Sequence, residues 1–188
     1  MNLLRLDTFT APPTAPLAAM FEPCGRCNGG GKFIGRNGRE LGPCFTCKGE
    51  GKLRTRAAIE AAAVVVDDDA LRATFDKLLA SGLKRVKLRM KGFQVKPAKA
   101  GSKNEGALYV TQDGGGTYLG KVINGKFLKM DCCTPETASK VAALIADPMA
   151  AIKATGQEVG NCAICGLELT DPASLAIGIG PVCLERLS

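Results

Sequence analysis

The chain has 188 residues and a formal net charge of +7, with 9 cysteines, no histidine and no tryptophan. Because aromatic residues make up only 5% of the chain, we expect small cores supported by metal instead of one large hydrophobic core. The absence of histidine removes the commonest general base and the imidazole ligands of most catalytic zinc sites, so the composition argues against an enzyme.

Residues 1–22 contain one early arginine, followed by Pro12, Pro13 and Pro16. The prolines interrupt any apolar run, so this segment has the pattern of neither a secretory signal nor a membrane span, and we predict a flexible arm. Cysteines in a chain without a secretory signal are expected to bind metal instead of forming disulfides. We therefore expect a cytoplasmic protein.

Residues 23–53 are organised by two copies of the pattern Cys-x-x-Cys-x-Gly-x-Gly. Each cysteine pair places two sulfurs on one tight turn, and two such turns supply the four thiolates of a tetrahedral structural zinc site. The paired glycines let the chain turn sharply through backbone conformations that residues with a Cβ resist. The predicted zinc ligands are Cys24, Cys27, Cys44 and Cys47.

The doubled motif over residues 24–51 resembles the cysteine-rich zinc module of J-domain chaperones, of which DnaJ is the familiar member. That family typically has several such repeats and more than one zinc ion, so two repeats imply a single metal site in a β-hairpin-like module. The resemblance also implies a surface that holds unfolded peptides. We expect this surface to be an exposed apolar groove near Phe33, Ile34 and Phe45.

Basic residues outnumber acidic ones around this module. The surplus either binds phosphate groups or offsets the negative charge of the zinc thiolates, and the sequence leaves both interpretations open. A Zn²⁺ held by four thiolates carries a net charge of −2, so two filled sites would lower the formal charge of the chain from +7 to about +3. The candidate phosphate contacts are Lys52, Arg54 and Arg56, with Arg39 as a further one.

Residues 54–157 are predicted to hold a helix, an antiparallel sheet and two further helices. Residues 55–66 favour a helix by their alanine content but end in three valines. A clearer helix begins at the aspartates 67–69 and ends at Gly82, with an apolar face that starts at Leu71. We favour helix capping over a metal or catalytic role for the aspartates, because consecutive carboxylates point in different directions.

Residues 84–91 alternate basic and apolar side chains, which predicts a strand with one basic face, and Gly92 is expected to mark a bulge or bend. Residues 84–103 hold eight basic residues and no acidic one, so this segment is the best candidate for binding nucleic acid. The alternative is a solvated strand that lysine protects from edge-to-edge pairing. The candidate contacts are Arg85, Lys87, Arg89, Lys91 and Lys96.

Strand-like segments follow, up to about residue 130. The Asn124-Gly125 pair between two of them is typical of a type I′ hairpin, so we predict an antiparallel meander of three or four strands. Tyr109, Tyr118 and Phe127 either face outward and stack on bases or belong to the core. We favour the core, because the chain has so few aromatic residues.

Two helices are predicted after the sheet. Thr134-Pro135 and Asp147-Pro148 are typical helix starts, and we expect the second helix to end near Gly156. We predict that both helices form a helical hairpin on one face of the sheet. The predicted fold class is therefore a small α+β protein, in which zinc-stapled modules surround an antiparallel β-meander with a helical hairpin.

Residues 158–188 carry a second metal motif. Cys162 and Cys165 form another Cys-x-x-Cys turn, and a Gly-Ile-Gly-Pro turn presents Cys183 at the start of a short helix. This treble-clef-like arrangement supplies three sulfurs to a second zinc ion.

The fourth ligand of the second site is open. Cys133 is our first choice, followed by Cys132 and then by Asp171, because aspartate also binds zinc. The alternative for the two adjacent cysteines is a reactive pair of thiols outside any metal site.

The pattern Cys-x-x-Cys-Gly-x-x-Leu-Thr-Asp-Pro-x-Ser, followed by Gly-Ile-Gly-Pro-x-Cys, resembles a zinc-binding domain of unknown function that is common in bacteriophage proteins and at the ends of some helicase-like chains. The resemblance extends more loosely over about residues 70–188. It implies a phage or prophage origin, with the host cytoplasm as the location, and it implies no established reaction.

Two functions follow from these motifs. The first is a zinc-binding accessory protein that binds the backbone of DNA or RNA through its basic strand, with an affinity that falls steeply with salt. The second is a protein-interaction module, which either holds peptides as the J-domain chaperones do or docks on a host replication or transcription protein.

Overall fold

The computed structural model describes residues 20–83, 86–114 and 116–187. The chain forms two compact units, residues 1–61 and 62–188. The predicted N-terminal arm lies almost entirely outside the described residues, and so does Arg85.

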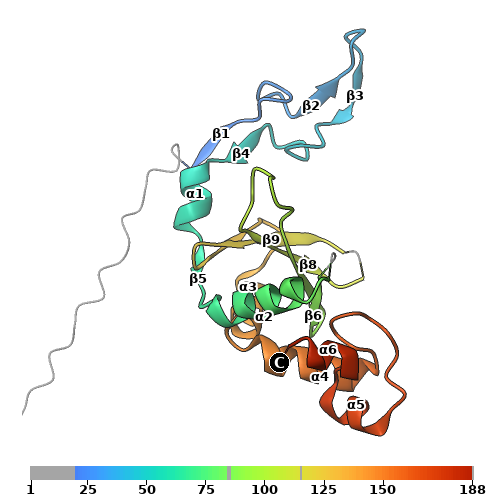
Figure 1. Ribbon diagram of the computed structural model, residues 1–188. Coiled ribbons are helices and arrows are strands. Elements are labelled where there is room, and N and C mark those ends of the chain that lie inside the picture. The colour runs from blue at the N-terminus through green and yellow to red at the C-terminus, as the bar shows by residue number, and fades with distance from the viewer. Residues whose placement is uncertain (1–19, 84–85, 115, 188) are drawn as a thin grey trace, which may run out of the picture. The chain divides into compact units, whose positions relative to one another are not determined.

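The first unit consists of two short antiparallel ribbons and one helix (Figure 1). β1 (Phe21–Pro23) pairs with β4 (Lys52–Arg54), and β2 (Lys32–Ile34) pairs with β3 (Glu40–Pro43). α1 (Arg56–Ala61) follows β4. The buried cluster of this unit consists of Cys24, Cys44 and Cys47, with Cys27 and Leu53 packed against it. Because sulfur atoms make up most of this cluster, the ribbons have almost no hydrophobic core of their own.

The second unit is built on a six-stranded antiparallel sheet of order β5-β10-β9-β8-β7-β6. Its strands are β5 (Val64–Val65), β6 (Leu88–Met90), β7 (Phe93–Pro97), β8 (Leu108–Gln112), β9 (Tyr118–Ile123) and β10 (Lys126–Lys129). The five strands from β6 to β10 pair in chain order, which confirms an antiparallel meander longer than the one predicted. The valines after α1 do not continue that helix, since they form β5 at the edge of the sheet.

Two hairpin turns of the sheet have positive backbone angles. Asn124 has φ 51° and Gly125 has φ 68°, as the predicted type I′ turn requires. Lys91 and Gly92 repeat this geometry between β6 and β7, with φ 43° and 83°. Within the described residues, the predicted basic strand covers only Leu88–Met90: Val86 and Lys87 precede it outside the strand, and the chain reverses direction at Lys91 and Gly92, where the sequence predicts a bulge or bend.

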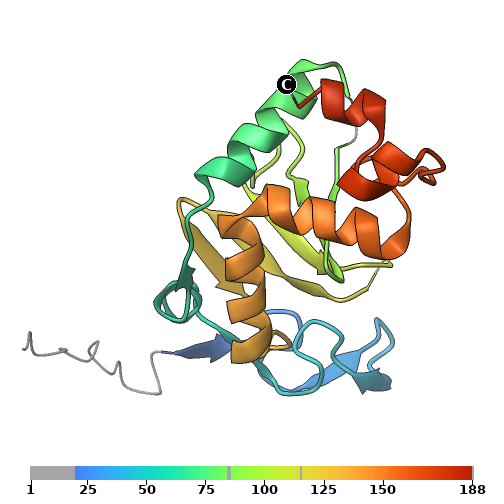
Figure 2. The same cartoon turned by 90° about the horizontal axis from the view of Figure 1, so that it is seen from below.

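Three long helices pack on one face of the sheet (Figure 2): α2 (Asp69–Ala80), α3 (Pro135–Ala146) and α4 (Pro148–Val159). Thr134 caps α3, since its side chain accepts a hydrogen bond from the Thr137 N–H. The predicted helical hairpin is not confirmed. Asp147 alone separates α3 from α4, and Figure 2 shows the two helices meeting at a wide angle. A hairpin of helices needs a connection of about two to five residues.

Helix α4 continues past its predicted end. Gly156 lies inside the helix, where an added Cβ would come within 1.8 Å of the Gly178 carbonyl oxygen at the end of α5 (Pro172–Ile177). Position 156 therefore requires glycine, because the backbones of α4 and α5 approach each other closely there. Gly160, at φ 73°, ends the helix. α6 (Pro181–Glu185) completes the unit.

The two faces of the sheet differ in burial. One face carries the core, with Leu88, Val95, Val110, Val122 and Phe127 at most 1% exposed. The side chains that alternate with them point away from the helices and are partly or fully exposed. Among the described residues, no helix is long and apolar enough to cross a membrane.

Candidate metal centres and the open face of the sheet

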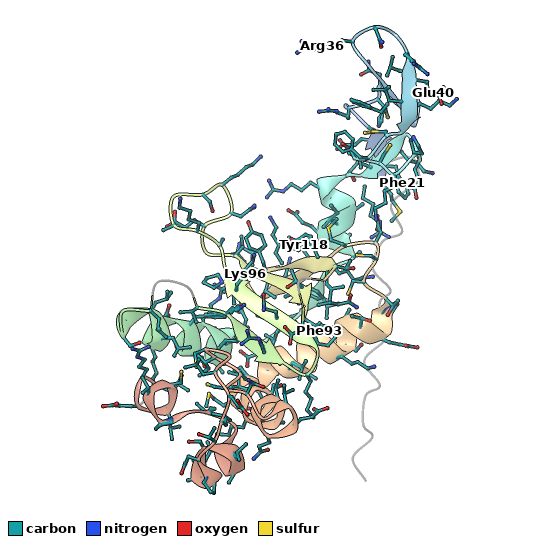
Figure 3. All side chains as sticks on the ribbon, turned by 90° about the vertical axis from the view of Figure 1, so that its right-hand side faces the viewer. Phe21, Arg36, Glu40, Phe93, Lys96 and Tyr118 are labelled. Atoms are coloured by element: carbon teal, nitrogen blue, oxygen red, sulfur yellow. The ribbon has the colours of Figure 1, made fainter. Side chains whose placement is uncertain are left out.

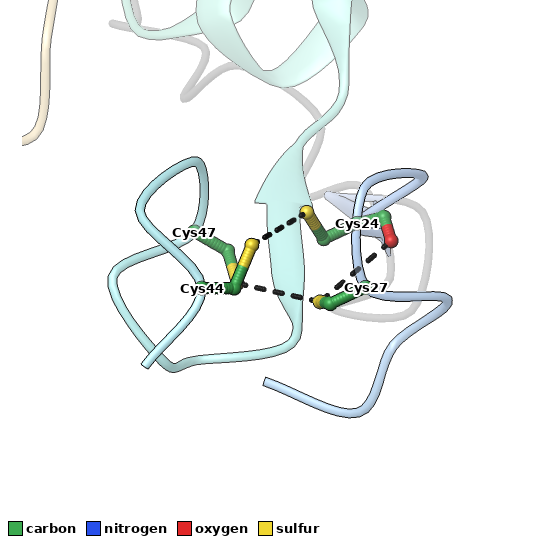
Figure 4. A group of neighbouring side chains, drawn as sticks. All are labelled: Cys24, Cys27, Cys44 and Cys47. Carbon is green, nitrogen blue, oxygen red and sulfur yellow. Dashed lines mark hydrogen bonds between the residues drawn. The ribbon is translucent and has the colours of Figure 1, made fainter. Parts of the chain in front are cut away.

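The first cysteine group brings four sulfur atoms to one point (Figure 4). The sulfurs of Cys24, Cys27, Cys44 and Cys47 all lie within 4.8 Å of one another. The Cys24–Cys44 distance is 4.0 Å and the Cys27–Cys47 distance is 3.7 Å. Four sulfurs around a tetrahedral zinc at its usual bond length are about 3.8 Å apart. The group therefore has the ligand count and the spacing of a structural metal site.

The backbone builds both cysteine turns in the same way. The Gly29 N–H donates to the Cys24 carbonyl at 3.2 Å, and the Gly49 N–H donates to the Cys44 carbonyl at the same distance. The turns are also bonded to each other, because the Cys24 N–H reaches the Gly51 carbonyl at 2.8 Å and the Cys44 N–H reaches the Gly31 carbonyl at 2.8 Å. The repeated sequence thus produces two copies of one turn that face each other.

The last glycine of each repeat is required by this contact. Gly31 has φ 71°, and a Cβ added there would lie 2.3 Å from the Gly49 carbonyl oxygen. Gly51 has φ 73°, and its Cβ would lie 2.2 Å from the Gly29 carbonyl oxygen. These residues are glycines because two backbones meet there, in addition to the turn that the sequence predicts.

The thiols of this group differ in acidity when no metal is bound. Hydrogen bonding from the Cys47 backbone N–H lowers the pKa of Cys44 to about 6. Burial raises the pKa of Cys27 to about 11. Cys44 is therefore largely a thiolate at neutral pH, whereas Cys27 keeps a proton that metal binding must displace.

The second cysteine group contains Cys162, Cys165 and Cys183, whose sulfurs also lie within 4.8 Å of one another. Cys162 and Cys165 stand on a turn in which the Gly166 N–H donates to the Cys162 carbonyl at 2.8 Å. Cys183 is supplied by α6. Burial raises the pKa of Cys183 to about 12. Burial also tends to raise the pKa of Cys162, but hydrogen bonds from backbone N–H groups outweigh it, so the pKa of Cys162 is lowered.

The structure does not bring Cys133, our first choice for the fourth ligand, into this group. Cys133 is 2% exposed in the hydrophobic core just before α3, and its sulfur contacts the Thr134 carbonyl at 3.8 Å. Cys132 instead donates to the Tyr118 carbonyl at 3.3 Å. The sequence cannot show this difference, because both cysteines precede the same helix and only the packing of that helix decides where they point.

Asp171, the third choice, shares a cavity of about 250 Å³ with the three sulfurs. Its carboxylate caps α5 by accepting a hydrogen bond from the Ser174 N–H at 2.8 Å. Its carboxylate oxygens are not among the ligand atoms that lie within 4.8 Å of one another, so within the described residues the structure brings only the three sulfurs together.

The predicted nucleic-acid contacts differ in their exposure and in the partners that they already have. Lys87, Lys91 and Lys96 are exposed, as a binding surface requires. Lys52 lies over the Phe21 ring at 4.8 Å, Arg54 is partly buried, and Arg56 forms an ion pair with Glu60 at 2.8 Å.

Arg89 differs from these residues, because it packs against the second cysteine turn. Its backbone N–H donates to the Ala163 carbonyl at 3.0 Å, and an added Cβ at Gly166 would lie 2.9 Å from the guanidinium nitrogens. Its Nε lies 3.9 Å from the Asp113 carboxylate. Arg89 therefore connects the sheet to the cysteine turn, a role that alternation in the sequence does not reveal.

The outward face of the sheet carries a row of polar side chains across the central strands (Figure 3). Lys96 on β7 stands opposite Tyr109 on β8, which stands opposite Lys121 on β9. Thr111 stands opposite Tyr118 in the next row, and Tyr118 is 39% exposed. The described residues that point outward on β6 to β10 include no carboxylate.

The three aromatic residues of the meander therefore have different positions. Phe127 is fully buried, as expected for a core residue, whereas Tyr109 and Tyr118 lie on the outward face. Sequence reasoning also missed Lys121. No simple alternation identifies it, because the register between β8 and β9 shifts between Val110 and Thr111, so that Tyr118 and Lys121 lie on the same face although they are three residues apart.

The first unit has an exposed apolar surface on its second ribbon. Ile34, Leu41 and Phe45 are 53%, 60% and 65% exposed. The Phe33 and Phe45 rings lie 5.6 Å apart, and the Arg26 guanidinium lies over both rings. Ile34 and Phe45 are therefore exposed, as the predicted groove requires, whereas Phe33 is only partly exposed and the groove itself stays a prediction.

Comparison with known proteins gives a match to the C-terminal part of the chain. Residues 152–188 match a family of unknown function, DUF6011. The matched segment takes in the end of α4, the second cysteine group and both short helices. No curated protein and no solved structure matches the chain.

Proposed function

We propose that this chain is a phage-type, zinc-binding accessory protein that binds nucleic acid. The observation that carries the proposal is the outward face of the sheet, where exposed or partly exposed lysines and tyrosines stand together on strands that contain no acidic residue. Such a surface attracts the phosphate backbone, and counterion release supplies much of the binding free energy.

Zinc is the metal that fits both cysteine groups. A set of four thiolates at tetrahedral spacing favours zinc or an iron–sulfur cluster over hard cations, and paired Cys-x-x-Cys turns are typical of structural zinc. We infer that the first zinc holds the two ribbons together. We infer that the second zinc is bound by the sulfurs of Cys162, Cys165 and Cys183; within the described residues no fourth side chain joins this group.

The proposed binding surface differs from the predicted basic strand. Its centre is the row through Lys96 and Lys121, and Lys126 stands on the same face of β10. Lys99 and Lys103, in the connection between β7 and β8, are also exposed and add positive charge beside this row. The resemblance of the C-terminal motif to a zinc domain of phage proteins supports an accessory role in phage nucleic-acid metabolism.

Fluorescence anisotropy with labelled oligonucleotides tests the proposal. We expect the zinc-loaded protein to bind with an affinity that falls linearly with salt on a log–log plot. A variant with Lys96→Glu and Lys121→Glu should lose most of this binding. The matched control is Lys140→Glu with Lys153→Glu, which reverses two exposed lysines on α3 and α4, away from the sheet face. Equal affinity of both double variants, or no binding at low salt, would refute the proposal.

A second candidate function is protein interaction through the apolar patch of the first unit. The exposed Phe45, Ile34 and Leu41 are the observation that favours it, and the resemblance to the J-domain zinc module suggests extended peptides as the ligand. A denatured model protein, such as reduced and carboxymethylated lactalbumin, would then be held in solution by the wild-type chain. A Phe45→Ser variant should fail to do so, and an equal effect of both proteins would reject this function.

A further inference from the structure

We propose that the outward face of the sheet selects single-stranded nucleic acid, by stacking an unpaired base on Tyr118 beside Tyr109. This inference rests on the proposed function and names its ligand class. It comes from four observations: the tyrosine pair, the residues that fix Tyr109, the lysines on both sides of Tyr109, and the absence of acidic residues from strands β6 to β10 themselves.

The two tyrosines form one aromatic surface. Their ring centroids lie 6.0 Å apart at an interplanar angle of 68°. In this edge-to-face arrangement, one ring supports the other and leaves a face of the exposed ring free for a third aromatic group. Tyr118, labelled in Figure 3, is the more exposed of the two. A base stacked on it would complete a three-ring cluster.

The surface is fixed in place before any ligand arrives. The Asn104 amide donates to the Tyr109 hydroxyl at 3.1 Å, and its carbonyl oxygen accepts from the Lys121 ammonium at 2.8 Å. Asn104 belongs to the connection between β7 and β8 and therefore ties this connection to the sheet face. Ordered side chains lose less conformational entropy when a ligand binds, so this network favours binding.

The lysines stand where a strand's phosphates would pass. Lys96 and Lys121 flank Tyr109 on the two neighbouring strands, at registers directly opposite to it. Two strand spacings separate them by about 9.6 Å. A base stacked on Tyr118 would lie in the row next to Tyr109, so phosphates of the same nucleotide strand can meet Lys96 and Lys121.

This arrangement favours unpaired over paired nucleic acid. In a duplex the faces of the bases are covered by their neighbours, and only their edges are exposed in the grooves. An exposed aromatic ring on a sheet stacks on the faces of unpaired bases, which is the usual way in which sheet platforms bind single strands.

The chain provides its own spectroscopic probe of this surface. It contains two tyrosines and no tryptophan, so intrinsic fluorescence reports on Tyr109 and Tyr118 alone. We expect a 15-residue oligothymidylate to quench this emission, after correction for its absorbance, and to do so in parallel with the anisotropy of a labelled copy. A duplex of the same length should bind more weakly and quench less.

Variants at Tyr118 separate stacking from charge. Tyr118→Leu keeps an apolar side chain and removes the ring, and we expect roughly five- to hundred-fold weaker binding of the oligothymidylate. Tyr118→Phe keeps the ring and should bind nearly as well as the wild type. Because Tyr118 lies at the surface, circular dichroism and zinc content should be the same for all three proteins, and these measurements check that each variant is folded.

The outcomes distinguish this inference from the function on which it rests. If oligonucleotides bind with the expected salt dependence but Tyr118→Leu binds as the wild type does, stacking is refuted and nucleic-acid binding stands. If the duplex binds as tightly as the single strand, selection for single strands is refuted. If nothing binds at low salt, both proposals fail. If poly-glutamate displaces the oligonucleotide at equal concentration, the face is a general surface for polyanions and acidic proteins, which also overturns the inference.

Discussion

The two cysteine groups show two ways of building a metal site. The first is closed by the local sequence, because two copies of one turn supply four sulfurs and bond to each other through their glycine carbonyls. The second has one such turn, and its third sulfur comes from α6. Its sulfurs are in place because the turn, Arg89 and the short helices are packed onto a large core. A repeat can thus define a site by itself, whereas a single motif needs the fold around it.

Metal removal should produce the largest difference between the two groups. The first unit has a buried cluster made mostly of cysteines, so it should unfold when zinc is removed by a strong chelator. Structural zinc contributes about 10–16 kcal/mol of apparent binding free energy in small zinc domains, more than a cluster of this size replaces. Hydrogen exchange followed by mass spectrometry should show lost protection over residues 20–54 and retained protection in β7 to β10. Restored protection on adding zinc is the control, and unchanged protection over residues 20–54 would contradict the comparison.

Replacing single cysteines should change the metal content by whole equivalents. Cys183→Ser removes a sulfur of the second group, and we expect zinc per chain to fall from two to one by elemental analysis. Cys133→Ser is the matched control, because Cys133 lies outside the group and should leave the zinc content unchanged. It should lower the free energy of unfolding by about 1–3 kcal/mol, since it buries a hydroxyl in an apolar site. A loss of one zinc in Cys133→Ser would return Cys133 to the ligand set.

Glycine substitutions should weaken the first site without touching a ligand. Gly51→Ala places a Cβ 2.2 Å from the Gly29 carbonyl oxygen, so the two turns must move apart. We expect roughly 10- to 100-fold weaker zinc binding, as for other changes beside metal ligands, measured by competition with a chromophoric chelator. Gly38→Ala is the control, because Gly38 has a similar φ of 75° with no atom within 4 Å of the added Cβ. Equal effects of both variants would mean that backbone strain alone, and not the contact between the turns, limits the site.

Zinc affinity should fall as the pH falls, and this is the smallest of the expected effects near neutrality. Zinc binds thiolates, and burial holds the pKa of Cys27 near 11 and that of Cys183 near 12 in the metal-free chain. Each thiol that must lose its proton weakens apparent binding by up to about tenfold for every unit of pH below its pKa. Because the pKa of Cys44 is about 6, the slope for the first site should steepen by one proton below that pH. Calorimetry in buffers of different ionisation enthalpy counts the protons released, and a pH-independent affinity would contradict these pKa directions.

Much of the fold could be predicted from periodicity and turn residues. Asn124-Gly125 indicated its hairpin, Thr134-Pro135 indicated a helix start, and the antiparallel meander is confirmed. The basic strand was predicted too long within the described residues, because Val86 and Lys87 lie outside β6 and Lys91 takes a positive φ in the turn that follows it, which is uncommon for a residue other than glycine. Asp147 was correctly predicted to begin a helix. The preceding helix, α3, ends at Ala146, so Asp147 alone separates it from α4 and leaves no room for a hairpin connection. The residue at which α3 ends depends on packing.

The sequence by itself determined the first sulfur group and the Cys162–Cys165 pair of the second, because Cys-x-x-Cys spacing acts over a few residues and fixes two ligands on one turn. Only the tertiary structure decided which way the side chains of longer segments point. Cys133 went to the core, Arg89 went to the second cysteine turn, and Tyr118 went to the outward face. The physical reason is that each direction follows from burying one side of a strand or helix against residues far away in the chain. A local pattern specifies that an element has two sides, and the packing of the whole unit selects the side that is buried.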